Sequence, residues 1–305
     1  MGSLSKRLGQ ITALSLESES SQILRTIKPN KIPNSLSQRL DTTLKDSHDM
    51  KTFGLGTLAS MANKERYVRF TKSLYGVYST MEDELDRCAK TSFKSTSDGS
   101  DGSQENVNRI EIDGDVSNLS EALKDQQSPV AYFWNRHSEI LRRSELLQKD
   151  ILAVSADEKL GDEASYSKAT LEYMQAIREA GNKDRKDGSG RLLGHAYTRY
   201  LADLMGGSVL ATPTRLALRL EEGTPEQYTF SFPAENDRKG YVGMIYSDLN
   251  ESGKLMNDDD SKLEEVVEEA RLAFRHNIAV YGEEPIILDS FRGLKSMASG
   301  YFFHK

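Results

Sequence analysis

The chain has 305 residues, of which 37% are hydrophobic and 29% charged, and a formal net charge of −7. This composition is typical of a globular protein with one sizeable core, and the negative charge argues against a nucleic-acid partner. The single cysteine, Cys88, excludes an internal disulfide and a CxxC metal site. No apolar run reaches the roughly 20 residues that a membrane span requires, so we expect no transmembrane segment.

Apolar residues recur at steps of three and four along most of the chain, which predicts helices. A helix is expected from Tyr67 to about Leu85, and Cys88 near its end is expected to be buried or half-buried. A second helix is expected over residues 123–154, with Pro129 near its start. A third covers 166–180, where Gly181 is expected to stop it.

Further helices are predicted from Arg191 and over residues 261–281. Ser261 is the expected N-cap of the latter, because Glu264 three residues later would complete a capping box. Alternation typical of a strand is nearly absent, and YTFSF at 228–232 is the one short candidate. The polar stretch 181–190 is predicted to be a loop.

The polar composition of two segments indicates the domain organisation. Residues 1–35 are expected to be a flexible or targeting segment, which is compatible with a cytoplasmic or organellar but not a secreted protein. Residues 36–285 are expected to form the main domain, and 286–305 a C-terminal extension. The Ser-, Gly- and Asp-rich stretch 92–118 is predicted to be a mobile insertion in the main domain.

The most informative motif is GHAYTRYLADLMGG at residues 194–207. His195, Arg199 and Asp203 follow at intervals of four and would share one helix face. Gly206 and Gly207 each lower helix stability by about 1 kcal/mol relative to alanine in a helix interior. Glycines are found there where the backbone bends or where a flat group approaches it. The motif resembles HAYTRYLGDLSGG, the distal helix of the heme oxygenases. The alternative is a kinked core helix with a surface salt bridge between Arg199 and Asp203.

A second resemblance lies at residues 36–54, LSQRLDTTLKDSHDMKTFG, which are similar to the first helix of that family. His48 matches the histidine that binds iron there, and Leu36, Leu40 and Leu44 precede it at intervals of four. The alternative is that His48 is a core residue. Similarity continues at residues 73–86, 142–151 and 264–283, so it covers about 36–283.

The resemblance implies an all-α, multi-helix bundle that holds heme between a proximal helix and a glycine-kinked distal helix. Heme would be both cofactor and substrate, cleaved oxidatively at its α-meso carbon to biliverdin, CO and Fe(II). Electrons would come from a reductase or ferredoxin, because the chain has no recognisable flavin or nicotinamide motif. The protein would be a monomer.

The resemblance also implies residue roles. His48 would bind iron, Asp203 would order the distal water network, and Arg199 and Tyr78 would support Asp203. Gly206 and Gly207 would let the backbone approach the heme. His195 would be structural and hydrogen-bonded away from the iron.

This sequence departs from the family at positions that would contact the heme. Asp41, Val242 and Tyr246 stand where basic residues hold the heme propionates, and Tyr197 is the propionate-binding residue that remains. Ala202 replaces a common glycine beside the heme. Two readings therefore stay open: a working heme oxygenase, or a heme-oxygenase-like binding or scaffold protein with weak or altered heme binding and no turnover. A third is a helical adaptor without a ligand.

Overall fold

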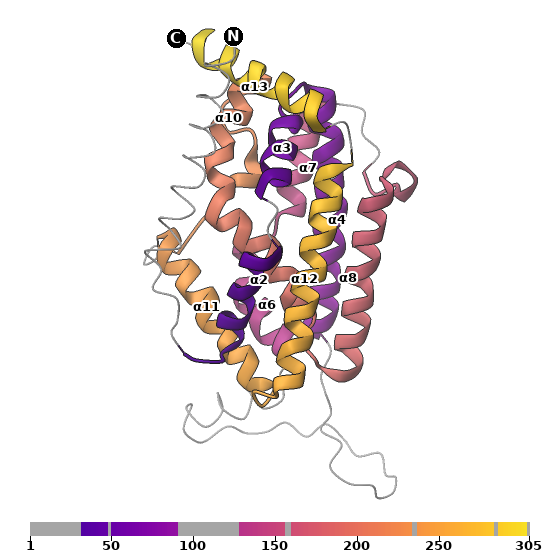
Figure 1. Cartoon of the computed structure of the whole chain (residues 1–305), viewed down its shortest axis with the longest axis vertical. Coiled ribbons are helices and arrows are strands. Elements are labelled where there is room, and N and C mark those ends of the chain that lie inside the picture. The colour runs from indigo at the N-terminus through magenta and orange to yellow at the C-terminus, as the bar shows by residue number, and fades with distance from the viewer. Residues whose placement is uncertain are drawn as a thin grey trace, which may run out of the picture.

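A computed structural model describes residues 32–47, 50–90, 128–155, 160–233, 237–283 and 286–303. Within these ranges the chain is a bundle of helices without a strand, which confirms the predicted all-α class (Figure 1). The N-terminal segment up to residue 31 and the predicted insertion at 92–118 lie outside the described residues.

The helices follow one another in chain order, with short 3₁₀ and π-helical pieces between some of them. They are α2 (Leu36–Ser47), α3 (Met50–Ser60), α4 (Lys64–Lys90), α6 (Pro129–Leu141), α7 (Ser144–Val154), α8 (Lys168–Asp187), α9 (Leu192–Ala196), α10 (Ser208–Leu218), α11 (Arg238–Leu255), α12 (Asp260–Gly282) and α13 (Ile286–Phe303). Two π-helical stretches, η2 (Tyr197–Leu201) and η3 (Asp203–Gly207), join α9 to α10. The 3₁₀ turns are η1 (Glu163–Ser165) and η4 (Glu226–Tyr228).

Helix α4 lies at the centre of the bundle and packs against α6, α7 and α8. Helices α4, α8 and α12 run side by side along the long axis (Figure 1). Aromatic rings fill the core: Tyr200 lies 5.6 Å from Tyr78 of α4 and 5.9 Å from Trp134 of α6, measured between ring centroids. Cys88 is buried near the end of α4, as predicted.

The prediction of a single helix over residues 123–154 is wrong. The described part of this stretch forms two helices that meet at Arg142 and Arg143. Glu82 of α4 explains the break: its Oε1 accepts backbone N–H groups from Arg143, at 2.7 Å, and from Ser144, at 3.1 Å. This carboxylate therefore satisfies the free N–H groups at the start of α7. Pro129 lies in the first turn of α6, after the N-cap Ser128.

The prediction that Gly181 ends a helix is also wrong, since α8 continues to Asp187. The helix ends at Gly188, whose φ of 66° is left-handed and suits glycine. Gly181 has a different function, because a Cβ there would overlap the carboxylate of Glu84 on α4. It allows α4 and α8 to pack closely, and most of the predicted loop 181–190 is helical.

Two smaller predictions are corrected. The N-cap of α12 is Asp259, not Ser261, and its carboxylate accepts the backbone N–H of Ser261 at 2.8 Å. Residues 228–232 are not a strand. Their chain is extended after η4, and Phe230 and Phe232 instead pack against the core with their rings stacked 5.9 Å apart.

The C-terminal helix α13 packs against α3 and α10 at one end of the bundle (Figure 1). Two glycines make these contacts close: Gly293 lies against the carbonyl of Leu58 in α3, and Gly300 against that of Leu216 in α10. Among the helices that the structure describes, none combines the length and apolarity that crossing a membrane would require.

Candidate functional site

The motif GHAYTRYLADLMGG forms the middle of a continuous helical segment, α9–η2–η3–α10, which we call the distal segment. Its π-helical turns begin at Tyr197, well before the two glycines. Such wide turns are rare, and they occur frequently at functional sites. The distortion therefore covers the whole motif and is not confined to Gly206 and Gly207.

The start of the distal segment is fixed by contacts from α8 and α12. Asp184 of α8 accepts the backbone N–H groups of Arg191, at 2.7 Å, and Leu192, at 2.8 Å. Gly194 lies so close to α12 that an added Cβ would be 2.6 Å from the carbonyl oxygen of Val266. These contacts define both the direction of the segment and its distance from α12.

His195 is fully buried, and its Nε2 lies 3.0 Å from Oε1 of Glu269 on α12. The ring is also close to Tyr173 of α8, at 5.7 Å between centroids. His195 is thus a structural link between the distal segment and its neighbours, as the sequence predicted.

Three residues that the sequence singled out, Tyr78, Arg199 and Asp203, meet in one buried chain of hydrogen bonds. Arg199 Nη2 donates to the Tyr78 hydroxyl at 3.0 Å, and that hydroxyl donates to Asp203 Oδ2. Arg199 also lies 4.0 Å from the Asp203 carboxylate. We call this the distal cluster, and α4 and the distal segment together build it.

Asn277 of α12 belongs to the same network, although no pattern in the sequence singled it out. Its Oδ1 accepts a hydrogen bond from Arg199 Nη1 at 2.9 Å, inside the core. An asparagine in the middle of an amphipathic helix carries no recognisable motif. Only the packing of α12 against the distal segment identifies its role, which is to hold the Arg199 guanidinium in place.

Burial dominates the electrostatics of the distal cluster. Removal from water raises the pKa of Asp203, an effect that Arg199 and Tyr78 partly oppose. Burial also raises the pKa of Tyr78 far above its ordinary value, so its hydroxyl keeps its proton. Asp203 is therefore a buried carboxyl group with a raised pKa, held in place by a phenol and a guanidinium.

One strip of the distal segment is left uncovered by the described part of the chain. Ala202 is exposed, Gly206 is half-buried and the Asp203 side chain is 20% exposed. The neighbouring residues Leu201 and Leu204 are buried. An exposed alanine and a half-buried glycine therefore lie beside the partly exposed Asp203 carboxyl group on this strip. Gly207 differs, because it faces Tyr228, whose Cδ1 would lie 3.1 Å from an added Cβ.

A second polar group lies where α2, the distal segment and α11 meet. The hydroxyls of Tyr197 and Tyr246 both donate to Oδ1 of Asp41, each at 2.7 Å. We call these three residues the Asp41 cluster. Burial first, together with the Asp41 carboxylate, raises the pKa of each phenol, so both hydroxyls stay protonated donors. Val242, one turn before Tyr246, is completely buried.

The predicted iron ligand His48 lies outside the described residues, between the end of α2 at Ser47 and the start of α3 at Met50. Its role therefore remains a prediction. Within the described chain, histidine, cysteine and carboxylate side chains form no group of three or more that would hold a metal ion.

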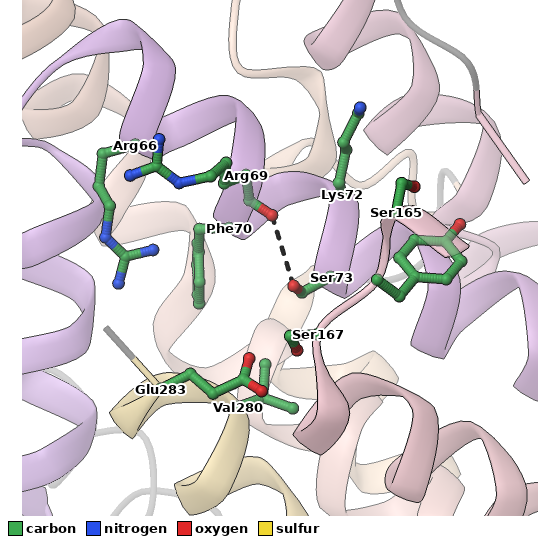
Figure 2. A pocket seen from close by; sticks show the side chains of 10 residues that line it. Arg66, Arg69, Phe70, Lys72, Ser73, Ser165, Ser167, Val280 and Glu283 are labelled. Atoms are coloured by element: carbon green, nitrogen blue, oxygen red, sulfur yellow. Dashed lines mark hydrogen bonds between the residues drawn. The ribbon is translucent and has the colours of Figure 1, made fainter. Parts of the chain in front are cut away.

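A separate cavity of about 300 Å³ opens between α4, the turn before α8 and the end of α12 (Figure 2). Arg66 and Arg69 line it, but each faces a carboxylate of the protein, Asp289 at 3.6 Å and Glu65 at 2.7 Å. Glu283 at its edge accepts the backbone N–H of Ala169 at 2.8 Å. The cavity carries its own counter-charges, so we assign it no ligand.

The fold and the distal segment define a class, the all-α helical bundles that contain a long helical segment distorted by π-helical turns. Comparisons with known proteins identify the family. The family model described as heme oxygenase matches residues 116–283, more than half of the chain, and the chain belongs to that family.

Individual relatives are distant. The chain is 25% identical over 264 residues to heme oxygenase 1 of Bos taurus, covering 83% of this chain and 73% of that protein. It is 27% identical over 226 residues to a heme oxygenase of Rhodella violacea, covering 74% of this chain and 75% of that protein. Its fold is similar to the structure of heme oxygenase-1 from Synechocystis sp. PCC6803 in complex with heme. That match has a TM-score of 0.55 and 23% identity and covers 88% and 98% of the two chains.

Proposed function

We propose that this protein is a heme oxygenase that binds heme against the distal segment and cleaves it at the α-meso carbon to biliverdin, CO and Fe(II). The distal cluster of Tyr78, Arg199 and Asp203 is the observation that carries this proposal. It joins a buried carboxyl group with a raised pKa to the uncovered strip of the distal segment, which we call the wall. The same arrangement would have no purpose in a helical adaptor without a ligand.

The residues of the wall fit heme on the distal side. Ala202 and Gly206 would face the porphyrin plane, since they are small and uncovered. His48 would supply a neutral imidazole to the iron from the other side. Heme iron, when bound and reduced, supplies the oxygen chemistry that attacks the ring.

The distal cluster would manage protons for this chemistry. Asp203 would accept and return a proton at its carboxylate and hold water at the wall. Tyr78 would fix the orientation of that carboxylate, and Arg199 would fix Tyr78 from the other side. Because Arg199 is itself held by Asn277, the carboxylate is positioned before any ligand arrives.

Electrons would come from a reductase or a ferredoxin, since the chain carries no recognisable site for a flavin or a nicotinamide. The proposal therefore includes an external redox partner of one of these two kinds.

Hemin titration tests the proposal. We expect a Soret band that saturates at one hemin per chain and, after addition of a ferredoxin or reductase system in air, conversion of bound heme to a bilin. His48→Ala should change the ligation spectrum, and His137→Ala, at a buried histidine of α6, should not. Absence of a Soret band at micromolar hemin would exclude any heme function.

A second candidate is a heme-oxygenase-like binding protein without turnover. The Asp41 cluster favours it, because a carboxylate stands where the family holds the heme propionates with basic residues. A stable Soret band with no bilin formed under reducing conditions would select this candidate over the enzyme.

A further inference from the structure

The Asp41 cluster links α2, the distal segment and α11 through two hydrogen bonds to one carboxylate oxygen. Tyr197 is 2% exposed and Tyr246 3% exposed, and both hydroxyls point to the same carboxylate oxygen. The three residues come from three different helical elements. Their meeting is therefore a product of the fold and requires an exact fit between α2, η2 and α11.

A phenol has a single O–H donor. In this cluster each of the two donors is already directed to Asp41, and hydrogen bonds to a charged carboxylate are about twice as strong as neutral ones. A carboxylate from a ligand would find only the lone pairs of Tyr197 and Tyr246, and it would lie beside a second carboxylate. Carboxylates this close oppose each other's ionised form.

We propose that Asp41 is a specificity-determining residue, a built-in carboxylate that keeps a porphyrin propionate from the hydroxyls of Tyr197 and Tyr246. At this edge the site would favour a metalloporphyrin with a neutral group, such as an esterified side chain, over one with a charged propionate. This inference rests on the proposed heme site, and it concerns which tetrapyrrole enters that site.

The test compares hemin with hemin dimethyl ester, whose propionates carry no charge, by Soret titration of the full chain. The wild type should bind the ester at least as tightly as hemin. Asp41→Ala should raise hemin affinity by about tenfold or more, since it releases two donors for charge-assisted bonds. The affinity for the ester should change by less than about twofold, because an ester cannot form charge-assisted bonds.

A double-variant comparison assigns the gain to the phenols. Tyr246→Phe alone should change hemin affinity little, because its proton is committed to Asp41. In the Asp41→Ala background, the same Tyr246→Phe change should remove most of the gain. Asp41→Asn, which keeps the size and one acceptor oxygen, should give a smaller gain in hemin affinity. It provides the same test if the Asp41→Ala protein does not fold.

Asp83→Ala is the control for net charge, because Asp83 lies exposed on α4. It should leave both affinities unchanged. Wild-type protein that prefers hemin strongly over the ester, or Asp41 variants that shift both ligands equally, would overturn the inference while leaving the heme site intact. No Soret band with either ligand in any variant would instead overturn the proposed function.

Discussion

At the scale of single residues, Asp203 combines burial with partial access to solvent. Its carboxylate accepts the Tyr78 hydroxyl, faces Arg199, and still exposes 20% of its side chain on the uncovered strip. Burial raises the pKa of this carboxyl group, so it takes up a proton more readily than an exposed aspartate does. We therefore expect a substitution of Asp203 to affect the proposed reaction through proton transfer, and not only through packing.

Asp203→Asn should lower the rate of bilin formation by about a hundredfold, the lower end of the effect of removing a general acid or base. Asparagine still accepts the Tyr78 hydroxyl but cannot take up a proton. Hemin affinity from the Soret band should stay close to wild type. Asp83→Asn, an exposed change on α4, is the matched control. An Asp203→Asn enzyme at full rate would remove Asp203 from the proposed proton path.

At the scale of elements, the distal segment depends on how closely α9 approaches α12. Gly194 is the contact point, because an added Cβ would lie 2.6 Å from Val266 O and 2.7 Å from Ala270 N. Both are backbone atoms, which cannot move aside as a flexible side chain would. The glycine that opens the motif is thus required by packing.

We expect Gly194→Ala to lower the free energy of unfolding by about 1–3 kcal/mol, the usual effect of overpacking. It should also lower bilin formation, since it shifts the segment that carries Asp203. Gly243→Ala is the control: Gly243 lies within α11 with nothing within 4 Å of its would-be Cβ. That change should be neutral or stabilise by up to about 1 kcal/mol. Denaturant unfolding of both variants measures the difference, and equal effects would contradict the packing argument.

At the scale of the whole molecule, buried carboxyl groups couple stability to pH. Asp184, which is 2% exposed and holds the start of the distal segment, has its pKa raised by burial from 3.8 to about 6. Burial raises the pKa of Asp150 to about 6 as well. In both cases the folded chain binds the proton more tightly than the unfolded chain does.

The stabilisation from Asp184 should therefore be complete below about pH 4 and be lost as the pH rises through about 6. A shift of two units corresponds to about 3 kcal/mol. Asp184→Asn removes this titration, so the free energy of unfolding of the wild type minus that of the variant should fall by up to this amount as the pH rises across that range. Urea unfolding at several pH values measures it, and a difference that does not change with pH would refute the assignment.

Local patterns in the sequence were enough to predict most of the helices and most of the distal cluster. Steps of three and four predicted the helices, and spacing of four placed Arg199 and Asp203 together. A resemblance to heme oxygenases added Tyr78, which does meet them. The helix boundaries were less accurate, because Glu82 of α4 sets the start of α7 from another helix, and because Gly181 serves close packing against Glu84 and does not end α8. The iron ligand His48 stays a prediction.

The sequence by itself determined the helical class, the family resemblance and the motif that forms the distal wall, because these depend on residues close together in the chain. Only the tertiary structure decided what the substituted position 41 does. Asp41 is 156 residues from Tyr197 and 205 from Tyr246, yet all three share one pair of hydrogen bonds. Spacing along a helix carries no information about such contacts, which arise when α2, the distal segment and α11 pack together and exclude water.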